Sequence, residues 1–240
     1  MFRFIIAGCW TVIFLILSIP IIFIEWLIGF KWPEKKALSS QWIVTRAFRV
    51  LLFISGTVVE TEGLENLIKD RPVLYVPNHR SIYDIIITYP MLPSQTGYIA
   101  KKEIRFIPVF STWMKFMNCY FLDRHDLRDG LKMINHAKKI INSGSSVCIF
   151  PEGTRNKLEN DLLEFHAGCF KIAEKTKCPV ICVTIIGSAD IFENHLPFIK
   201  KTKVKVIYSK PIYTDDYSKE DFKNLSSLVR EQITENLKNN

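Results

Sequence analysis

The sequence predicts an α/β fold, in which a mixed, largely parallel central sheet is flanked by helices and preceded by N-terminal membrane-associated helices. Two observations point to this fold. Residues 4–24 carry no charged side chain, and short β-rich runs alternate with helical patterns from residue 58 onwards. The 240 residues are enough for one such domain with a sizeable core. We therefore expect a membrane-associated helical segment at residues 1–57 and a single α/β domain at residues 58–240.

The uncharged run at residues 4–24 is the first expected element. As a helix it would be about 30 Å long, close to the hydrocarbon thickness of a bilayer. Pro20 interrupts the run, so a transmembrane helix and a helix that dips into one leaflet and returns are both open. A cleaved signal peptide is not favoured, because only Arg3 gives the start basic character and no cleavage site follows Ile24. Residues 31–40 then read as a linker.

A second apolar stretch covers residues 42–59. Arg46 and Arg49 lie three residues apart in it, and residues such as Val50 and Ile54 can share a broad apolar face. A basic amphipathic helix of this kind fits a membrane surface, with its arginines at the headgroups. An ordinary helix that packs on the core is the alternative.

Short β-rich runs predict the strands of the sheet. Several of them end at a proline or are followed by polar residues, as is typical of strands that lead into a turn. The predicted strands are residues 58–62, 71–77, 97–100, 119–122, 147–150, 179–186 and 204–208.

Apolar residues at helical spacing predict the intervening helices. Gly144 is expected to end one of them, and Ser218 with Asp221 is expected to cap the start of the last. The predicted helices are residues 82–88, 106–116 (helical or irregular), 129–143, 168–176 and 218–237. There is no internal repeat, low-complexity tract or second α/β domain in this pattern.

The chain is basic, with a net charge of +8. Anionic lipid, a phosphorylated substrate or an acidic carrier would each suit this charge. We discount nucleic acid because no binding motif accompanies the charge. The six cysteines include no CxxC pair and lie mostly in apolar runs. This pattern favours buried free thiols in a reducing compartment, and it offers no Cys/His spacing for zinc.

The first polar cluster, residues 78–84, reads Asn-His-Arg-Ser-Ile-Tyr-Asp and follows a β-run. Imidazole is well matched to proton transfer near neutral pH, so His79 is a candidate general base. If His79 lies in the turn and Asp84 one turn into the helix, the carboxylate can accept a hydrogen bond from one ring nitrogen and leave the other free. Ser81 suggests a Ser-His-Asp triad, but the GxSxG elbow is absent. The hydroxyl that His79 activates then belongs to the substrate.

The second polar cluster, residues 150–155, reads Phe-Pro-Glu-Gly-Thr-Arg and also ends a buried strand. Gly153 lets the backbone approach a ligand closely, and Thr154 offers a hydroxyl. Arg155 can hold phosphate oxygens with two parallel hydrogen bonds. Glu152 is less expected beside a phosphate, and we assign it either to a substrate hydroxyl or to holding an arginine in place.

Further basic residues follow other strand-like runs. Arg124 comes after one such run, and Lys101 and Lys102 come after another. If the sheet is parallel here, these groups converge with His79 and Arg155 at one edge.

These blocks, in this order, resemble those of the PlsC-type glycerolipid acyltransferases, specifically the 1-acyl-sn-glycerol-3-phosphate (lysophosphatidic acid) acyltransferases. The family's NHxSxxD motif is matched at residues 78–84, and its FPEGTR motif is intact at residues 150–155. The residues at 101–108 resemble its Lys-x-Glu-Leu block, and Asp123-Arg124 matches the block that ends in Asp-Arg. The chain departs from the family at His166, where a lysine is common.

The resemblance implies a role for each matched position. His79 would be the general base toward the sn-2 hydroxyl of 1-acyl-glycerol-3-phosphate, and Asp84 would orient it. The acyl group would come from acyl-CoA or acyl-carrier protein, and the product would be phosphatidic acid. No metal and no tightly bound cofactor is expected. The glycerol phosphate would be held by Lys101, Arg124, Glu152, Gly153, Thr154 and Arg155.

The resemblance also implies a membrane-associated enzyme, with a transmembrane or re-entrant N-terminal helix and an active site that faces the cytoplasm. Its partners would be lysophosphatidic acid, the acyl donor and membrane lipids, without nucleic acid. Other acceptors stay open, namely another lysophospholipid, lyso-ornithine lipid or glycerol 3-phosphate. A non-catalytic membrane phospholipid-binding protein and a hydrolase that releases fatty acid are further alternatives.

Overall fold

A seven-stranded sheet organises the protein, whose computed structural model describes residues 1–158 and 161–239. The strand order is β1-β7-β6-β2-β5-β3-β4, and every neighbouring pair is parallel except β6 and β7. The predicted mixed, largely parallel sheet is therefore confirmed. The strands are β1 (Val58–Glu62), β2 (Leu74–Pro77), β3 (Thr96–Lys101), β4 (Tyr120–Leu122), β5 (Ser146–Cys148), β6 (Val180–Ile186) and β7 (Lys203–Tyr208).

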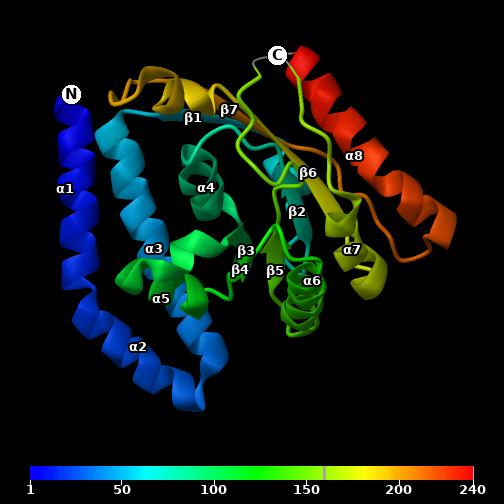
Figure 1. Cartoon of the computed structure of the whole chain (residues 1–240), viewed down its shortest axis with the longest axis horizontal. Helices are drawn as coiled ribbons and strands as arrows, with labels where there is room; N and C mark the ends of the chain where they lie inside the picture. Colours follow the sequence, from blue (N-terminus) through cyan, green and yellow to red (C-terminus); the bar gives the residue numbers. More distant parts are fainter. Residues whose placement is uncertain (159–160, 240) are drawn as a thin grey trace.

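Helices cover both faces of this sheet. In Figure 1, α1 to α5 lie on one side of the sheet and α6 to α8 on the other. The predicted helices that follow residue 58 are all present within a few residues of the expected ends. The helices are α1 (Phe2–Leu17), α2 (Ile19–Lys31), α3 (Pro33–Ser55), α4 (Tyr83–Thr88), α5 (Pro108–Phe116), α6 (Leu127–Asn142), α7 (Lys171–Thr176) and α8 (Lys219–Lys238).

Two hydrophobic cores form, one on each face, because successive strand residues point to opposite sides. Tyr75 and Ile181 belong to the core under α3, α4 and α5, whereas Leu74 and Val180 belong to the core under α6, α7 and α8. All four side chains are fully buried. Strands that are buried on both faces are typical of parallel sheets, and this explains why they read as continuous apolar runs.

The uncharged N-terminal run forms a bent helix pair. The axes of α1 and α2 differ by 48°, and Ser18 lies at the break, two residues before Pro20. The Ser18 hydroxyl accepts a hydrogen bond of 2.9 Å from the indole N–H of Trp113 in α5, which ties the bend to the domain. By length and composition, α3 could cross a membrane, and α1 with α2 could form one broken or re-entrant span.

The prediction of a linker at residues 31–40 is wrong. Only Trp32 separates α2 from α3, which begins at Pro33. Proline suits the first helical position, because the N–H that it lacks would have no intrahelical partner there. The glutamate, two lysines and alanine that follow are all good helix formers, so the polar composition there does not indicate a loop.

The helix expected within residues 42–59 is α3, which starts earlier than predicted and ends where Gly56 adopts a left-handed φ of 68°. Val44 and Ala47 are buried against the domain, while Trp42 and Phe53 are exposed. One face of α3 thus packs on the core, as in the alternative interpretation, and its other face presents apolar side chains to the surroundings.

Candidate active site

The carboxyl end of β2 turns sharply into the first polar cluster. The side chain of Asn78 continues the pairing with β6 after the strand has ended. Its amide N–H₂ donates to the Ile185 carbonyl at 3.0 Å, and its oxygen accepts from the Ile185 N–H at 2.7 Å. Asn78 is buried and fully engaged, so it fixes the point from which His79 projects.

His79 and Asp84 form the predicted pair. The distance between His79 Nδ1 and Asp84 Oδ2 is 2.8 Å, with the carboxylate in the first turn of α4 and fully buried. The same oxygen accepts the backbone N–H groups of Arg80 at 2.7 Å and Ser81 at 2.9 Å. A carboxylate can only accept, so Nδ1 carries the proton and Nε2 keeps its lone pair. The His79 side chain is 13% exposed, which leaves the ring accessible at the sheet edge.

The second cluster locks the histidine in place. The ring of Phe150 stacks on the ring of His79, with centroids 4.1 Å apart. Glu152 is buried, and its two oxygens accept the backbone N–H groups of His79 at 2.8 Å and Leu163 at 3.0 Å. Burial raises the pKa of Glu152 despite these hydrogen bonds. Glu152 thus braces the His79 turn, and its contact with substrate stays a prediction.

The residues predicted to hold phosphate come next in the chain. Gly153 has a left-handed φ of 68°, and a Cβ there would lie 2.9 Å from Nε2 of His166. Both facts explain why glycine occupies this position. Thr154 and Arg155 are exposed beyond it, and the N–H of Asn156 returns to the His79 carbonyl at 2.7 Å. The two polar clusters therefore form one surface.

Sequence reasoning missed Glu193, which lies on a short 3₁₀ helix, Glu193–His195. Its carboxylate accepts hydrogen bonds from the Ser81 hydroxyl, the Ile82 N–H and Nη1 of Arg155. The carboxylate that contacts Arg155 is thus Glu193 and not Glu152. The available signal was weak: Glu193 follows β6, whose carboxyl end lies at the same edge as that of β2.

The other predicted basic residues lie along the same edge but farther from His79. β5, β3 and β4 are parallel neighbours, so Lys101, the last residue of β3, and Arg124, which follows β4, lie at this edge. Three strand spacings separate β4 from β2, which is ~14 Å. Nζ of Lys101 lies 3.5 Å from Oε1 of Glu103. Partial burial of the Arg124 guanidinium lowers its pKa. These residues extend a basic rim and do not adjoin the His79 ring.

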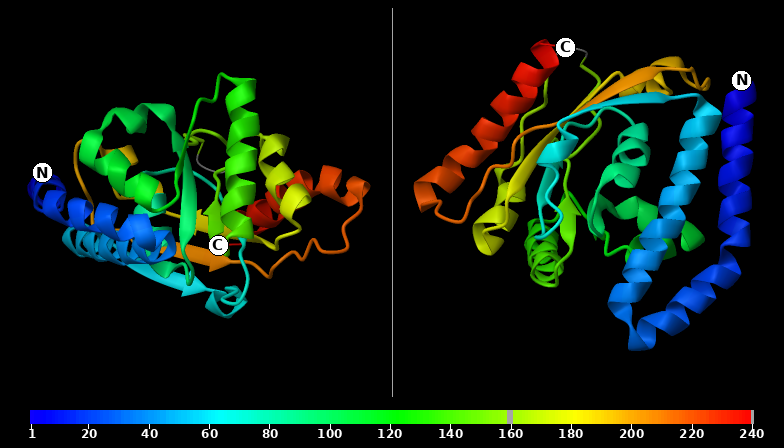
Figure 2. Two further views of the ribbon diagram at one scale, coloured as in Figure 1. Left: turned by 90° about the horizontal axis from the view of Figure 1, so that it is seen from below. Right: turned by 180° about the vertical axis from the view of Figure 1, so that it is seen from behind.

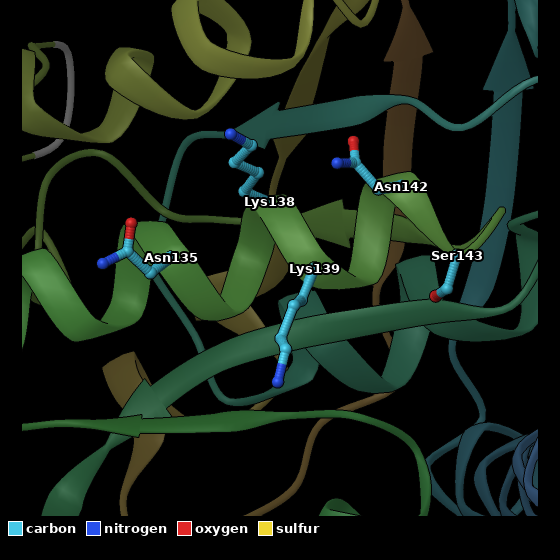
Figure 3. A pocket seen from close by; sticks show the side chains of 5 residues that line it. All are labelled: Asn135, Lys138, Lys139, Asn142 and Ser143. Carbon is cyan, nitrogen blue, oxygen red and sulfur yellow. The ribbon is translucent and has the colours of Figure 1, made fainter.

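Other candidate features lie away from this edge. Five cysteines are buried as expected, and Cys9 on α1 is exposed. Across residues 1–158 and 161–239, no group of three His, Cys, Asp or Glu side chains could hold a metal ion. A surface depression lies on the C-terminal half of α6 (Figure 3). Because α6 ends where β5 begins, this depression is at the opposite edge of the sheet. It is lined by Asn135, Lys138, Lys139, Asn142 and Ser143.

A His–Asp pair braced against an arginine-bearing loop, at the carboxyl edge of an α/β sheet, defines an enzyme-like site for proton removal beside an anionic group. Residues 58–186 match the Acyltransferase family, and the chain belongs to this family. The crystal structure of the 1-acyl-sn-glycerophosphate (LPA) acyltransferase PlsC from Thermotoga maritima has the same fold. Its TM-score is 0.73 with 24% identity, and the match covers 99% of this chain and 98% of that one.

Curated relatives carry a common name. The chain is 28% identical over 202 residues to the 1-acyl-sn-glycerol-3-phosphate acyltransferase of Saccharomyces cerevisiae, covering 83% of this chain and 66% of the yeast protein. It is 31% identical over 204 residues to a probable enzyme of the same name from Mycoplasma pneumoniae, covering 80% and 76%. It is 28% identical over 237 residues to the enzyme from Cocos nucifera, covering 97% and 74%.

Proposed function

We propose that this protein is a 1-acyl-sn-glycerol-3-phosphate acyltransferase, which acylates the sn-2 hydroxyl of lysophosphatidic acid to give phosphatidic acid. The observation that carries the proposal is the 2.8 Å His79–Asp84 pair held against the loop that bears Arg155. The activity named for the curated relatives supports the same reaction.

In the proposed step, Nε2 of His79 takes the proton of the sn-2 hydroxyl while the hydroxyl oxygen attacks the thioester carbonyl. The C–S bond then breaks, and the departing thiolate receives the proton from His79. The buried carboxylate of Asp84 keeps the ring in the required tautomer and stabilises the transient imidazolium. Acyl-CoA or acyl-carrier protein is the co-substrate, so the chemistry requires no resident cofactor.

The acceptor's phosphate would bind at the loop that follows Phe150. Arg155 supplies charged donors, Thr154 supplies a hydroxyl, and the turn at Gly153 brings the backbone close. Arg155 follows β5, the strand next to β2, so its phosphate site lies nearer to His79 than the rim at Lys101 and Arg124. We assign that rim to the outer part of the acceptor or to an anionic donor, whose phosphates also favour basic partners.

The segment at residues 1–57 is proposed to dock the enzyme on the membrane, with the domain of residues 58–240 on the cytoplasmic side. Arg3 donates to the Ser55 carbonyl at 3.0 Å, and the ring of Phe4 stacks on Phe192 at 5.7 Å. These contacts bring the start of α1 to the edge that bears His79, beside the β6–β7 segment, as both views in Figure 2 agree. A lipid held along the exposed apolar side chains of the helices would meet the catalytic edge there.

The test uses membranes that contain the full chain, lysophosphatidic acid and a long-chain acyl-CoA, with free thiol and phosphatidic acid followed together. Equal release of both is expected, and His79→Ala should lower the rate by about 10²- to 10⁴-fold, the usual contribution of a general base. His136→Ala is the matched control, because Nε2 of His136 hydrogen-bonds to the carbonyl of Asn118. Asn118 precedes β4 and therefore lies at the edge of the sheet opposite His79. Acyl-carrier protein and other lysolipids are tested next if acyl-CoA fails. Thiol release without an acylated lipid would indicate a hydrolase. A fully active His79→Ala variant would refute the catalytic assignment.

A further inference from the structure

Glu193 joins the two polar clusters through three hydrogen bonds. Oε1 accepts the Ile82 N–H at 2.8 Å and Nη1 of Arg155 at 2.9 Å, while Oε2 accepts the Ser81 hydroxyl. The Glu193 side chain is only 17% exposed, whereas the Arg155 side chain is 53% exposed. Glu193 is therefore anchored by the first cluster and independently of the arginine.

Arg155 depends on Glu193 in a way that Glu193 does not depend on Arg155. Among the residues that the structure describes, the guanidinium makes its side-chain hydrogen bond to Glu193 alone. A long, exposed arginine without a fixed partner samples many rotamers, and binding an anion would then require ordering it. Since guanidinium donors point in several directions, one edge can rest on a carboxylate while another faces a phosphate.

We infer that Glu193 is a positioning residue, which presets Arg155 for the phosphate of the acceptor lipid and is itself set by Ser81 and Ile82. The inference rests on the proposed function for the identity of the phosphate-bearing ligand. It also gives Ser81 a use that is not nucleophilic, because its hydroxyl donates to Glu193 rather than to His79. If Glu193 instead competed with the phosphate for Arg155, Glu193→Ala would lower Kd and KM for lysophosphatidic acid.

The experiment compares the parent with Glu193→Ala, Glu193→Gln and Ser81→Ala. It measures the Kd for lysophosphatidic acid in detergent micelles and the KM and kcat of acyl transfer. The Glu193–Arg155 hydrogen bond is present with and without ligand, so the effect of Glu193→Ala is the cost of ordering Arg155 on binding. That cost should raise Kd and KM by about two- to tenfold. kcat at saturating acceptor should stay within about twofold, because the His79–Asp84 pair is untouched. Glu193→Gln should rescue part of the loss, because its amide oxygen can still accept from Arg155.

Two further measurements separate positioning from general structural damage. In an Arg155→Ala background, Glu193→Ala should add no further rise in KM, since the residue it acts through is gone. With a monoacylglycerol acceptor, which lacks phosphate, Glu193→Ala should leave the rate unchanged. Glu174→Ala, an exposed glutamate on α7, is the matched control. Ser81→Ala provides a milder perturbation, and thermal melting reports whether each variant folds.

An unchanged or lower KM in Glu193→Ala overturns the inference, as does an equal loss with the phosphate-free acceptor. A fall in kcat alone also overturns it, because Glu193 would then act on the His79 turn. If the parent binds lysophosphatidic acid without transferring an acyl group, the proposed function fails while the Kd series still decides the role of Glu193. If the parent neither binds nor acylates this lipid, both proposals fall.

Discussion

Replacing Asp84 by asparagine tests the catalytic pair with little change in volume. In the structure, one carboxylate oxygen accepts three N–H groups, from the His79 ring and from the backbones of Arg80 and Ser81. The amide oxygen of Asp84→Asn can occupy the same place and accept all three. The tautomer of His79 is then kept and the negative charge is lost. The new amide N–H₂ takes the place of Oδ1, which is buried and has no hydrogen-bond partner among the described residues.

The size of this loss follows from the geometry. Charges about 4 Å apart interact by about 4 kcal/mol at an effective dielectric constant of about 20. That energy stabilises the imidazolium that forms when the sn-2 proton is taken, and every ~1.4 kcal/mol corresponds to a factor of ten in rate. We therefore expect Asp84→Asn to lower kcat by about 10³-fold while KM for lysophosphatidic acid stays within a small factor.

The assay is steady-state thiol release with lysophosphatidic acid, compared with thermal unfolding of the same preparations. Asp84→Asn should melt below the parent, because its buried amide N–H₂ lacks an acceptor among the described residues, at a cost of about 1–3 kcal/mol. Asp84→Ala should melt lower still, because it leaves several buried N–H groups without an acceptor, each at a similar cost. A kcat for Asp84→Asn within tenfold of the parent would refute the reasoning, since the buried charge would then contribute little to the reaction.

Two further predictions concern stability and membrane binding. Because burial raises the pKa of Glu152 above its ordinary value of 4.5, the folded protein holds this proton to higher pH than the unfolded chain does. Its contribution to stability is therefore complete below about pH 4.5 and declines as the pH rises through the raised value. The free energy of unfolding, measured with urea at a series of pH values, should show this decline in the parent and not in Glu152→Gln. An equal decline in both proteins would contradict the prediction. Phe53 on α3 is 86% exposed, so Phe53→Ser should leave the melting temperature unchanged. It should weaken binding to lipid vesicles by about tenfold, as expected for a lost buried phenyl group. Leu131→Ser on α6 is the control, and equal effects of the two variants would contradict docking through α3.

The parts of the site that the sequence predicts are the local ones. His79 and Asp84 are five residues apart at a strand-to-helix turn, a spacing that pairs them when the histidine lies in the turn and the aspartate at the start of the helix. Their association with the loop at residues 150–155 follows from the rule that parallel strands end at one edge. The N-terminal linker was mispredicted for a different reason. Its lysines resemble a solvent-exposed loop in composition, yet lysine is also a good helix former, and Pro33 starts a helix there.

Glu193 could not be predicted in this way, and the sheet topology explains why it reaches the site. Parallel neighbours need connections that return to the opposite edge before the next strand starts. β6 and β7 are antiparallel, with Ile186 opposite Lys205, so the chain that joins them begins and ends at the carboxyl edge of β2 and β5. The segment can therefore remain beside the two polar clusters, and its irregular backbone carries no periodic signal. The antiparallel pairing of β6 and β7 thus brings Glu193, the carboxylate that contacts Arg155, to the catalytic edge. The position of Arg155 therefore depends on the topology of the sheet.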